Sequence, residues 1–301
     1  MKYILQPNNI FSIMKFLLLF LILFIQGSLG AQEKIIYLHN GAAPGSENWN
    51  WTEGETTKNP MNSRMVYNVT RPALIRFDPD AGTANGTAVI IVPGGGLHVL
   101  MIDKFAILAK ELVKKGVTVF ILKYRLVQIE SDDPWQETMA NMKDSTLFQK
   151  KLATVSPFAT TDVTTAVKHV RLHAADYNIE KNKVGLIAFS AGSVLSLNAI
   201  FNSNDEAIPD FAAINSAVMR TVKKAPFKQK VPALFIAAAA DDQQADVLNS
   251  IELYNDWLAA KQPVELHIYT KGGHMLDDPP ANTWVVRFLE WMESMGLFRN
   301  K

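Results

Sequence analysis

The feature that most constrains the fold of this chain is a series of short, almost wholly apolar segments. They lie at residues 87–92 (TAVIIV), 117–123 (VTVFILK), 184–189 (VGLIAF) and 233–240 (ALFIAAAA). A strand with one face in water would alternate polar and apolar residues, and these segments do not. Strands that are apolar on both faces are typical of a parallel sheet, because its crossover helices cover both faces. The pattern therefore predicts a sheet buried between two layers of helices.

The rest of the chain supplies the helices and strands that such a sheet requires. Amphipathic stretches of helical length lie at residues 103–115, 161–177, 190–201, 246–260 and 280–295. Further strands are expected at residues 34–38, 64–69, 73–77, 211–218 and 264–270. Strands that alternate with helices form βαβ units, so the predicted fold class is α/β, with a central, mostly parallel sheet flanked by helices on both faces. Thr161 and Asp162 are expected to cap the second helix.

The domain organisation predicted from the sequence is a signal peptide followed by one domain. Residues 16–25 form an unbroken apolar run, Lys15 precedes it, and small residues follow at 27–31, which is the pattern of a cleaved export signal. The run is about half of the roughly 20 residues that span a bilayer. We therefore expect a signal peptide at 1–31, with 1–13 an over-extended start, and no stable membrane insertion after cleavage. The mature protein would be periplasmic or secreted.

The mature chain, residues 32–301, has no linker that would divide it, and we expect a single domain. Within it the pattern loosens at residues 124–160, which include Trp135 and many charges. This stretch is interpreted as a partly helical insertion over one end of the sheet.

Composition excludes several classes of function. The 30 basic and 29 acidic residues give a formal net charge of +1, so no basic surplus indicates nucleic-acid binding. The chain has no cysteine, which excludes disulfides, a thiolate zinc site and a cysteine nucleophile. His169 and His173 have the i, i+4 spacing of some metal ligands, but the motif H-E-x-x-H is absent. We expect neither a metal nor an organic cofactor.

The first candidate for chemistry is Ser190, which stands between the strand at 184–189 and the following helix. The surrounding sequence, Ala188-Phe189-Ser190-Ala191-Gly192, resembles the G-x-S-x-G turn that exposes a serine at the edge of a sheet. Small residues two before and two after the serine let strand and helix pass closely. Taken alone, the motif is equally compatible with a serine that caps a helix.

The second candidate is the glycine run after the strand at 87–92. Gly94, Gly95 and Gly96 can turn backbone amides outward, and with the amide of Ala191 they could hold an oxyanion. A tight turn is the alternative interpretation of the run alone. A phosphate-binding loop is disfavoured because no Gly-Lys-Ser/Thr follows.

The third and fourth candidates follow two later strands. Asp241 and Asp242 come after the strand at 233–240, and His274 comes after the strand at 264–270 and a Gly-Gly pair. Two exposed aspartates in a turn would be the simpler interpretation of the first pair. The order of glycine loop, serine, acid and histidine at successive strand ends is, however, the order of α/β-hydrolase catalytic groups. We therefore expect Ser190, His274 and one of the two aspartates to form a catalytic triad.

These motifs resemble the acetyl-xylan-esterase-type branch of the α/β-hydrolases, which is related to the esterase/lipase and dienelactone hydrolase groups. The resemblance runs from about residue 37 to residue 297 and assigns the acid to Asp242 rather than Asp241. Departures are Ala188 for a usual glycine, Ser193 where a further glycine is common, and the polar segment 243–246 after the acid. These departures concern substrate choice more than catalysis.

The resemblance implies hydrolysis of ester groups on carbohydrates, such as acetyl groups on xylan or xylo-oligosaccharides, through an acyl-enzyme. His98, close to the glycine loop, and Trp135, in the insertion, are the expected substrate contacts. The alternatives are a general carboxylesterase, a lipase, a peptidase, or a non-catalytic sugar-binding relative. The expected partner is a small-molecule or oligosaccharide ester.

Overall fold

A computed structural model describes residues 34–227 and 230–298 of the chain. The elements below belong to one compact unit that begins at Lys34. The predicted signal peptide at 1–31 lies outside the described residues, and the domain boundary proposed there stays a prediction. In the described ranges, no helix has both the length and the apolar character needed to cross a membrane.

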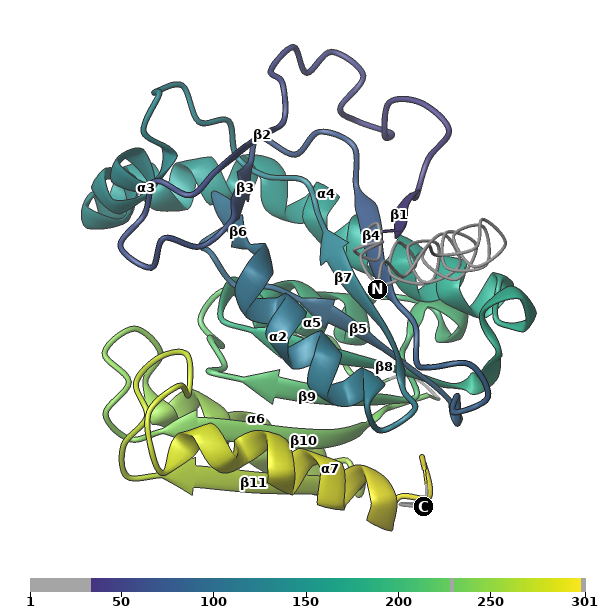
Figure 1. The fold of residues 1–301 in the computed structure, drawn as a ribbon. Coiled ribbons are helices and arrows are strands. Elements are labelled where there is room, and N and C mark those ends of the chain that lie inside the picture. The colour runs from purple at the N-terminus through teal and green to yellow at the C-terminus, as the bar shows by residue number, and fades with distance from the viewer. Residues whose placement is uncertain (1–33, 228–229, 299–301) are drawn as a thin grey trace, which may run out of the picture. The chain divides into compact units, whose positions relative to one another are not determined.

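Eight strands form the central sheet, in the spatial order β1-β4-β7-β5-β8-β9-β10-β11 (Figure 1). β1 pairs antiparallel with β4, and β4 pairs antiparallel with β7. All the other neighbouring strands are parallel. The strands are β1 (Lys34–Tyr37), β4 (Ala73–Phe77), β5 (Gly86–Val92), β7 (Thr118–Lys123), β8 (Ile179–Phe189), β9 (Phe211–Asn215), β10 (Ala233–Ala239) and β11 (Val264–Tyr269).

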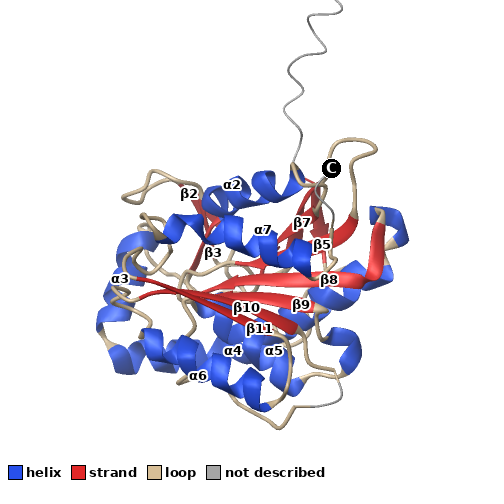
Figure 2. Cartoon of the chain, turned by 90° about the horizontal axis from the view of Figure 1, so that it is seen from below, coloured by secondary structure: helices blue, strands red, loops and turns tan. Residues whose placement is uncertain are grey.

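Helices cover the sheet on both faces (Figure 2). α2 (Ile102–Val113) and α7 (Trp284–Ser294) lie on one face. α4 (Ser145–Leu172), α5 (Ala191–Asn202) and α6 (Val247–Ala259) lie on the other face. α3 (Pro134–Lys143) packs against α4, and short 3-10 turns occur at Ala175–Tyr177, Asp205–Ala207 and Ala281–Thr283.

The two helical layers explain why the central strands are apolar along their whole length. Every residue of β7, β9 and β10 is buried, and so are six of the seven residues of β5. Polar side chains at these positions would lose hydration without gaining partners. The prediction of an α/β fold with a mostly parallel sheet between two helical layers is confirmed.

A second, three-stranded antiparallel sheet was not predicted. It contains β2 (Gly54–Thr56), β3 (Met65–Tyr67) and β6 (Val99–Met101), in that order. β3 lies within the strand expected at residues 64–69, whereas β2 and β6, with three residues each, are too short to show a period-two pattern in sequence. β6 begins three residues after Gly96, so this small sheet anchors the far end of the glycine loop.

The region predicted to be a loose insertion is mostly helical, and the predicted cap at Thr161 and Asp162 is wrong. α4 begins at Ser145, where the side chain of Asp144 accepts hydrogen bonds from the amides of Thr146 and Leu147, both at 3.0 Å. Pro157 inside the helix and the exposed charges of its first half hid the helical pattern. Asp162 lies in mid-helix, where it is fully buried.

The buried Asp162 carboxylate pairs with Arg125, which follows β7. Its Oδ1 lies 2.7 Å from Nη2 of Arg125, and the guanidinium also donates to the carbonyl of Pro44 at 2.7 Å and to that of Phe158 at 3.1 Å. Both ions are almost completely buried. The ion pair therefore connects the segment around Pro44 and helix α4 to the end of the central sheet.

Candidate active site

Ser190 occupies a sharp turn between β8 and α5. Its backbone has φ of 51° and ψ of −118°, a conformation that non-glycine residues adopt only under strain. The Ser190 amide donates to the carbonyl of Asn215 at the end of β9, at 3.2 Å, and the Ser190 carbonyl accepts from the amide of Ser193 at 2.9 Å. These bonds hold the turn in place, so that the hydroxyl projects from the end of the sheet.

The small residues around Ser190 are required by close packing. A Cβ atom on Gly192 would lie 2.2 Å from the carbonyl oxygen of Val92 and 2.6 Å from that of Pro93. Ala188 is fully buried in β8. Helix α5 therefore starts in contact with the end of β5, and the glycine loop that continues from β5 lies beside the serine.

Three side chains from distant parts of the sequence meet at this edge of the sheet. Nε2 of His274 lies 2.7 Å from Oγ of Ser190, and Nδ1 of His274 lies 2.9 Å and 3.0 Å from the two carboxylate oxygens of Asp242. The hydrogen bonds assign the proton to Nδ1, which leaves Nε2 as the acceptor for the serine hydroxyl. The structure thus brings together the three residues predicted to form a triad.

Asp242 is ionised in this arrangement, although its side chain is only 1% exposed. Burial by itself would raise the pKa of Asp242. The hydrogen bonds from His274 and from the amides of Ala245 and Gln244, at 3.0 Å and 2.8 Å, outweigh burial and hold the pKa below its usual value. The carboxylate can therefore stabilise a positive charge on the imidazole.

Asp241 has a different role from its neighbour. Its Oδ1 accepts a hydrogen bond from the amide of Gly273 at 2.9 Å, and this bond holds the loop that carries His274. The hydroxyl of Ser216, at the end of β9, donates to the carbonyl of His274 and holds the same loop from the other side. Sequence analysis did not identify Ser216 or Asn215, although polar residues directly after the apolar run FAAI were a usable signal.

The glycine loop lies against Ser190. A Cβ atom on Gly94 would lie 3.2 Å from Cβ of Ser190. Gly95 has φ of +129°, and a Cβ atom there would lie 1.9 Å from the carbonyl oxygen of Val99, so only glycine fits. The loop can pass this close to Ser190 because it has no side chains on the near face.

The carbonyl groups of the glycine loop accept hydrogen bonds from neighbouring residues, whereas its amides donate none to the described residues. Pro93 O accepts from the hydroxyl of Tyr124 at 2.8 Å, Gly95 O accepts from the amide of His98 at 3.0 Å, and Gly96 O accepts from Nδ1 of His98 at 2.7 Å. Among the described residues, no acceptor is found for the amides of Gly94, Gly95, Gly96 and Ala191. The site thus presents unpaired backbone donors close to Ser190.

Comparisons with known proteins agree with this geometry. A family model described as BD-FAE matches residues 145–226, which contain Ser190. The fold is similar to that of an acetyl ester-xyloside bifunctional hydrolase from Caldicellulosiruptor lactoaceticus, with a TM-score of 0.61 and 19% identity over 91% of this chain and 100% of that chain. It is also similar to a carboxylesterase from Lactobacillus plantarum, with a TM-score of 0.57 and 15% identity over 83% and 100% of the two chains. A third similar structure is esterase 2 from Thermogutta terrifontis, phosphonylated by sarin, with a TM-score of 0.58 and 14% identity over 78% and 93%.

The chain has the α/β-hydrolase fold. The resemblance to the α/β-hydrolase fold found in the sequence is thereby confirmed, and both the family model and these structural neighbours are of the esterase type. No curated protein matches the chain by sequence.

The two predicted substrate contacts differ in their placement within this α/β-hydrolase fold. His98 is fully buried beneath the glycine loop, where its ring stacks on Phe148 of α4 with centroids 5.4 Å apart. Burial lowers the pKa of His98, and the hydrogen bond to Gly96 only partly offsets this effect. His98 therefore supports the loop as a neutral ring. Trp135 is partly exposed at the start of α3, and its role as a substrate contact stays a prediction.

Phe148 was missed by sequence analysis because it lies in the stretch interpreted as an insertion. A Cβ atom on Gly96 would lie 3.4 Å from its ring, so α4 reaches the site. Within residues 34–227 and 230–298, no group of three histidine, cysteine, aspartate or glutamate side chains is arranged to hold a metal ion. The reactive groups described above are a hydroxyl, an imidazole, a carboxylate and backbone amides.

Proposed function

We propose that the chain is a serine carboxylic ester hydrolase that removes acyl groups, chiefly acetyl groups, from carbohydrates such as xylan or xylo-oligosaccharides. The observation that carries the catalytic part is the continuous hydrogen-bonded series Ser190–His274–Asp242 beside unpaired amides. The esterase-type family model and the esterases of the same fold support the reaction class. The similar fold of an acetyl ester-xyloside bifunctional hydrolase supports the carbohydrate substrate.

The geometry suits a two-step acyl transfer. Ser190 Oγ attacks the ester carbonyl carbon while His274 Nε2, at 2.7 Å, accepts the hydroxyl proton. The new negative charge on the carbonyl oxygen is held by the amides of Ala191 and Gly95, with those of Gly94 and Gly96 close by. His274 then gives the proton to the departing alcohol oxygen, the carbon–oxygen bond breaks, and the acyl group remains on Ser190.

Water completes the reaction by the reverse proton path. It gives a proton to His274 as its oxygen attacks the acyl carbon, and the proton passes to Ser190 Oγ as the carboxylic acid leaves. Asp242 keeps the imidazole in the required tautomer and stabilises its charged form in both steps.

The decisive test is the variant Ser190→Ala, measured by acetate release from p-nitrophenyl acetate and from acetylated xylo-oligosaccharides. Loss of the nucleophile in a serine triad lowers kcat by about 10⁶-fold, so activity should fall to background. Ser294→Ala, whose hydroxyl only donates to the carbonyl of Trp291 at the end of α7, should keep full activity. Circular dichroism checks that both variants are folded. Full turnover by the Ser190 variant would refute the mechanism.

The substrate part needs a separate measurement. Acetylated xylo-oligosaccharides should be hydrolysed with a higher kcat/KM than long-chain acyl esters or peptides. A higher kcat/KM for long-chain esters or peptides would reassign the enzyme to the lipases or peptidases. A serine-directed fluorophosphonate should label the wild-type protein and not the Ser190→Ala variant. If the protein is a non-catalytic sugar binder, neither the wild type nor the variant should be labelled.

We also propose that the protein is exported to the periplasm or the medium. The support is the apolar run at residues 16–25 with Lys15 before it and small residues after it. N-terminal sequencing of the protein recovered from the periplasm and the medium should give a start at Ala31 or Gln32. Recovery of the uncleaved chain only from the cytoplasm would overturn this proposal.

A further inference from the structure

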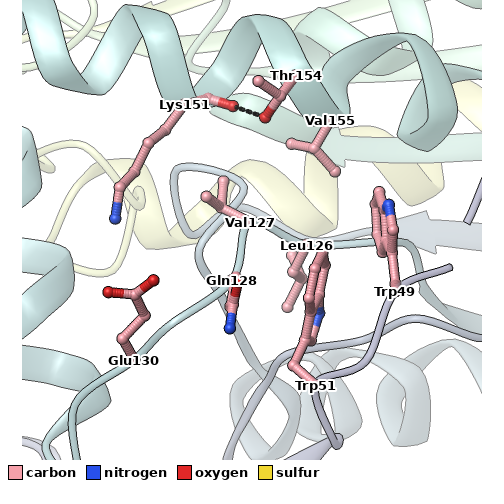
Figure 3. A pocket seen from close by; sticks show the side chains of 9 residues that line it. All are labelled: Trp49, Trp51, Leu126, Val127, Gln128, Glu130, Lys151, Thr154 and Val155. Atoms are coloured by element: carbon pink, nitrogen blue, oxygen red, sulfur yellow. Dashed lines mark hydrogen bonds between the residues drawn. The ribbon is translucent and has the colours of Figure 1, made fainter.

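Apart from the triad, the molecule has a cavity of about 240 Å³ between the segment that carries Trp49 and Trp51 and helix α4. Trp49 and Trp51 line one end of it, and Gln128, Glu130 and Lys151 line the other (Figure 3). It is smaller than the roughly 300 Å³ at which pockets for drug-sized ligands begin, so it suits a single ring. We call it the Trp51 cavity.

The aromatic end of the Trp51 cavity is held in place by its neighbours. The rings of Trp49 and Trp51 stack with centroids 4.5 Å apart and an interplanar angle of 25°. The edge of Phe158, on α4, packs against Trp49 at 5.7 Å. Both tryptophans remain partly exposed. A fixed, accessible aromatic surface of this kind loses little side-chain entropy when a ligand packs on it.

The polar end of the cavity carries donors and acceptors but little net charge. The side chains of Lys151 and Glu130 point toward one another (Figure 3). Lys151 Nζ also lies 3.4 Å from Oε1 of Glu137. The positive charge is therefore balanced from within the protein, and an anionic ligand would gain no attraction. The combination of an aromatic surface with Gln128, Glu130 and Lys151 matches a neutral ligand that has apolar ring faces and hydroxyl groups.

The Trp51 cavity is connected to the proposed ester site through shared elements. α4 places Phe148 against Gly96 and His98, and the same helix lines the cavity with Lys151, three residues further on. A three-residue advance along a helix is about 4.5 Å. On the opposite wall, the amide of Val127 donates to the carbonyl of Leu97, directly after the glycine loop, at 2.9 Å. The cavity therefore adjoins the glycine loop of the ester site through α4 and through Val127.

From these observations we propose that the Trp51 cavity binds a neutral pyranose unit of the carbohydrate substrate, next to the unit that carries the ester. This inference rests on the proposed carbohydrate esterase function. It adds a binding subsite to that function: the Trp51 ring packs against one face of the sugar, and Gln128, Glu130 and Lys151 bond to its hydroxyl groups.

The test measures binding and catalysis separately, with the full mature chain. Xylotriose, which has no ester, is titrated into the protein by calorimetry. An aromatic contact contributes about 0.5–1.5 kcal/mol, so Trp51→Ala should raise the Kd up to about tenfold. Trp51→Phe keeps an aromatic face and should bind within about threefold of the wild type. Tyr37→Ala, which removes a half-exposed aromatic ring from β1, is the matched control and should leave the Kd unchanged.

The kinetic arm uses two substrates. Trp51→Ala should raise KM for acetylated xylo-oligosaccharides by a similar factor and leave kcat/KM for p-nitrophenyl acetate unchanged, because this small ester does not reach the cavity. Lys151→Met, a second variant, should show the same difference with the tryptophans intact. An equal loss on both substrates would point to a structural defect and overturn the subsite.

The two proposals fail in distinguishable ways. Xylotriose binding that depends on Trp51, in a protein that hydrolyses no ester, would overturn the proposed reaction and keep the sugar site. Esterase activity with no xylotriose binding, or an unchanged KM of Trp51→Ala for acetylated xylo-oligosaccharides, would overturn the sugar site and keep the reaction.

Discussion

Replacement of Asp242 by asparagine tests how the carboxylate acts, because the structure shows what the new amide group would face. Oδ1 of Asp242 accepts from the amides of Gln244 and Ala245, and both carboxylate oxygens face Nδ1 of His274. In the Asp242→Asn variant, the amide oxygen can keep the two backbone donors only if the NH₂ group faces His274. The imidazole must then carry its proton on Nε2, where it can no longer accept the proton of Ser190.

The size of the effect follows from the two orientations of the asparagine. The orientation that keeps the active tautomer leaves the amides of Gln244 and Ala245 without their acceptor, and only Ala245 is buried, so its amide alone carries the cost of about 1–3 kcal/mol for an unpaired buried donor. The lost stabilisation of the charged imidazole adds to this cost. The corresponding change in a well-studied serine protease triad lowers kcat about 10⁴-fold, which is about 5.4 kcal/mol. We therefore expect kcat/KM to fall by about 10³- to 10⁴-fold.

The assay is hydrolysis of p-nitrophenyl acetate, with Asp241→Asn as the matched control on the adjacent carboxylate. Asparagine at 241 can still accept from the amide of Gly273, so this variant should lose less than about tenfold, the value of one neutral hydrogen bond. Calorimetry or circular dichroism checks the fold of both. If Asp242→Asn kept a tenth of the wild-type activity, or if Asp241→Asn lost as much, the assigned role of Asp242 would be wrong.

Three further predictions concern stability. Gly192→Ala should lower the free energy of unfolding in urea by about 1–3 kcal/mol, because its Cβ would lie 2.2 Å from a backbone carbonyl oxygen. Gly41→Ala, with open space around the new methyl group, should leave the stability unchanged, and equal urea midpoints for the two variants would contradict the close packing at Gly192. Because burial lowers the pKa of His98, the unfolded state binds the proton more tightly, so the stability of the folded state should fall as the pH drops below the unfolded pKa of 6.5. His98→Asn should reduce this loss when thermal unfolding is measured at a series of pH values, and an unaltered pH profile would contradict the buried, neutral state of His98. Asp162→Asn should cost about 3–5 kcal/mol in the same urea assay because Arg125 is left buried without its counter-charge, and a cost under about 1 kcal/mol would show that the pair is not a buried one.

Much of the fold could be predicted because the strands of a doubly covered sheet are distinctive in sequence. The segments TAVIIV, TVFILK and LFIAAA lie within β5, β7 and β10, and in each the residues of the strand are buried. The start of α4 could not be predicted in the same way. Most side chains of its first half are exposed, and Pro157 interrupts its pattern, so the capping role of Asp144 was hidden. The three-residue strands β2 and β6 are defined by their pairing rather than by their own sequence.

Part of the candidate site could likewise be predicted from the sequence, and part could not. Ser190, Asp242 and His274 were found because each lies just after a strand, and parallel strands end at one edge of the sheet. Nothing local in the sequence indicates that Trp49 and Trp51 share a cavity with Lys151, which is a hundred residues away. Nor does it indicate that His98 lies beneath the glycine loop and supports it through Gly96.

The sequence by itself thus determined the sheet and the strand ends that carry the reactive groups, because both depend on local periodicity and chain order. Only the tertiary structure decided that Asp241 holds the loop of His274, that Asp162 pairs with Arg125 inside the protein, and that aromatic and charged side chains enclose the Trp51 cavity. These outcomes depend on distances between residues far apart in the chain. Such distances are set when the whole core packs, and no short segment records them.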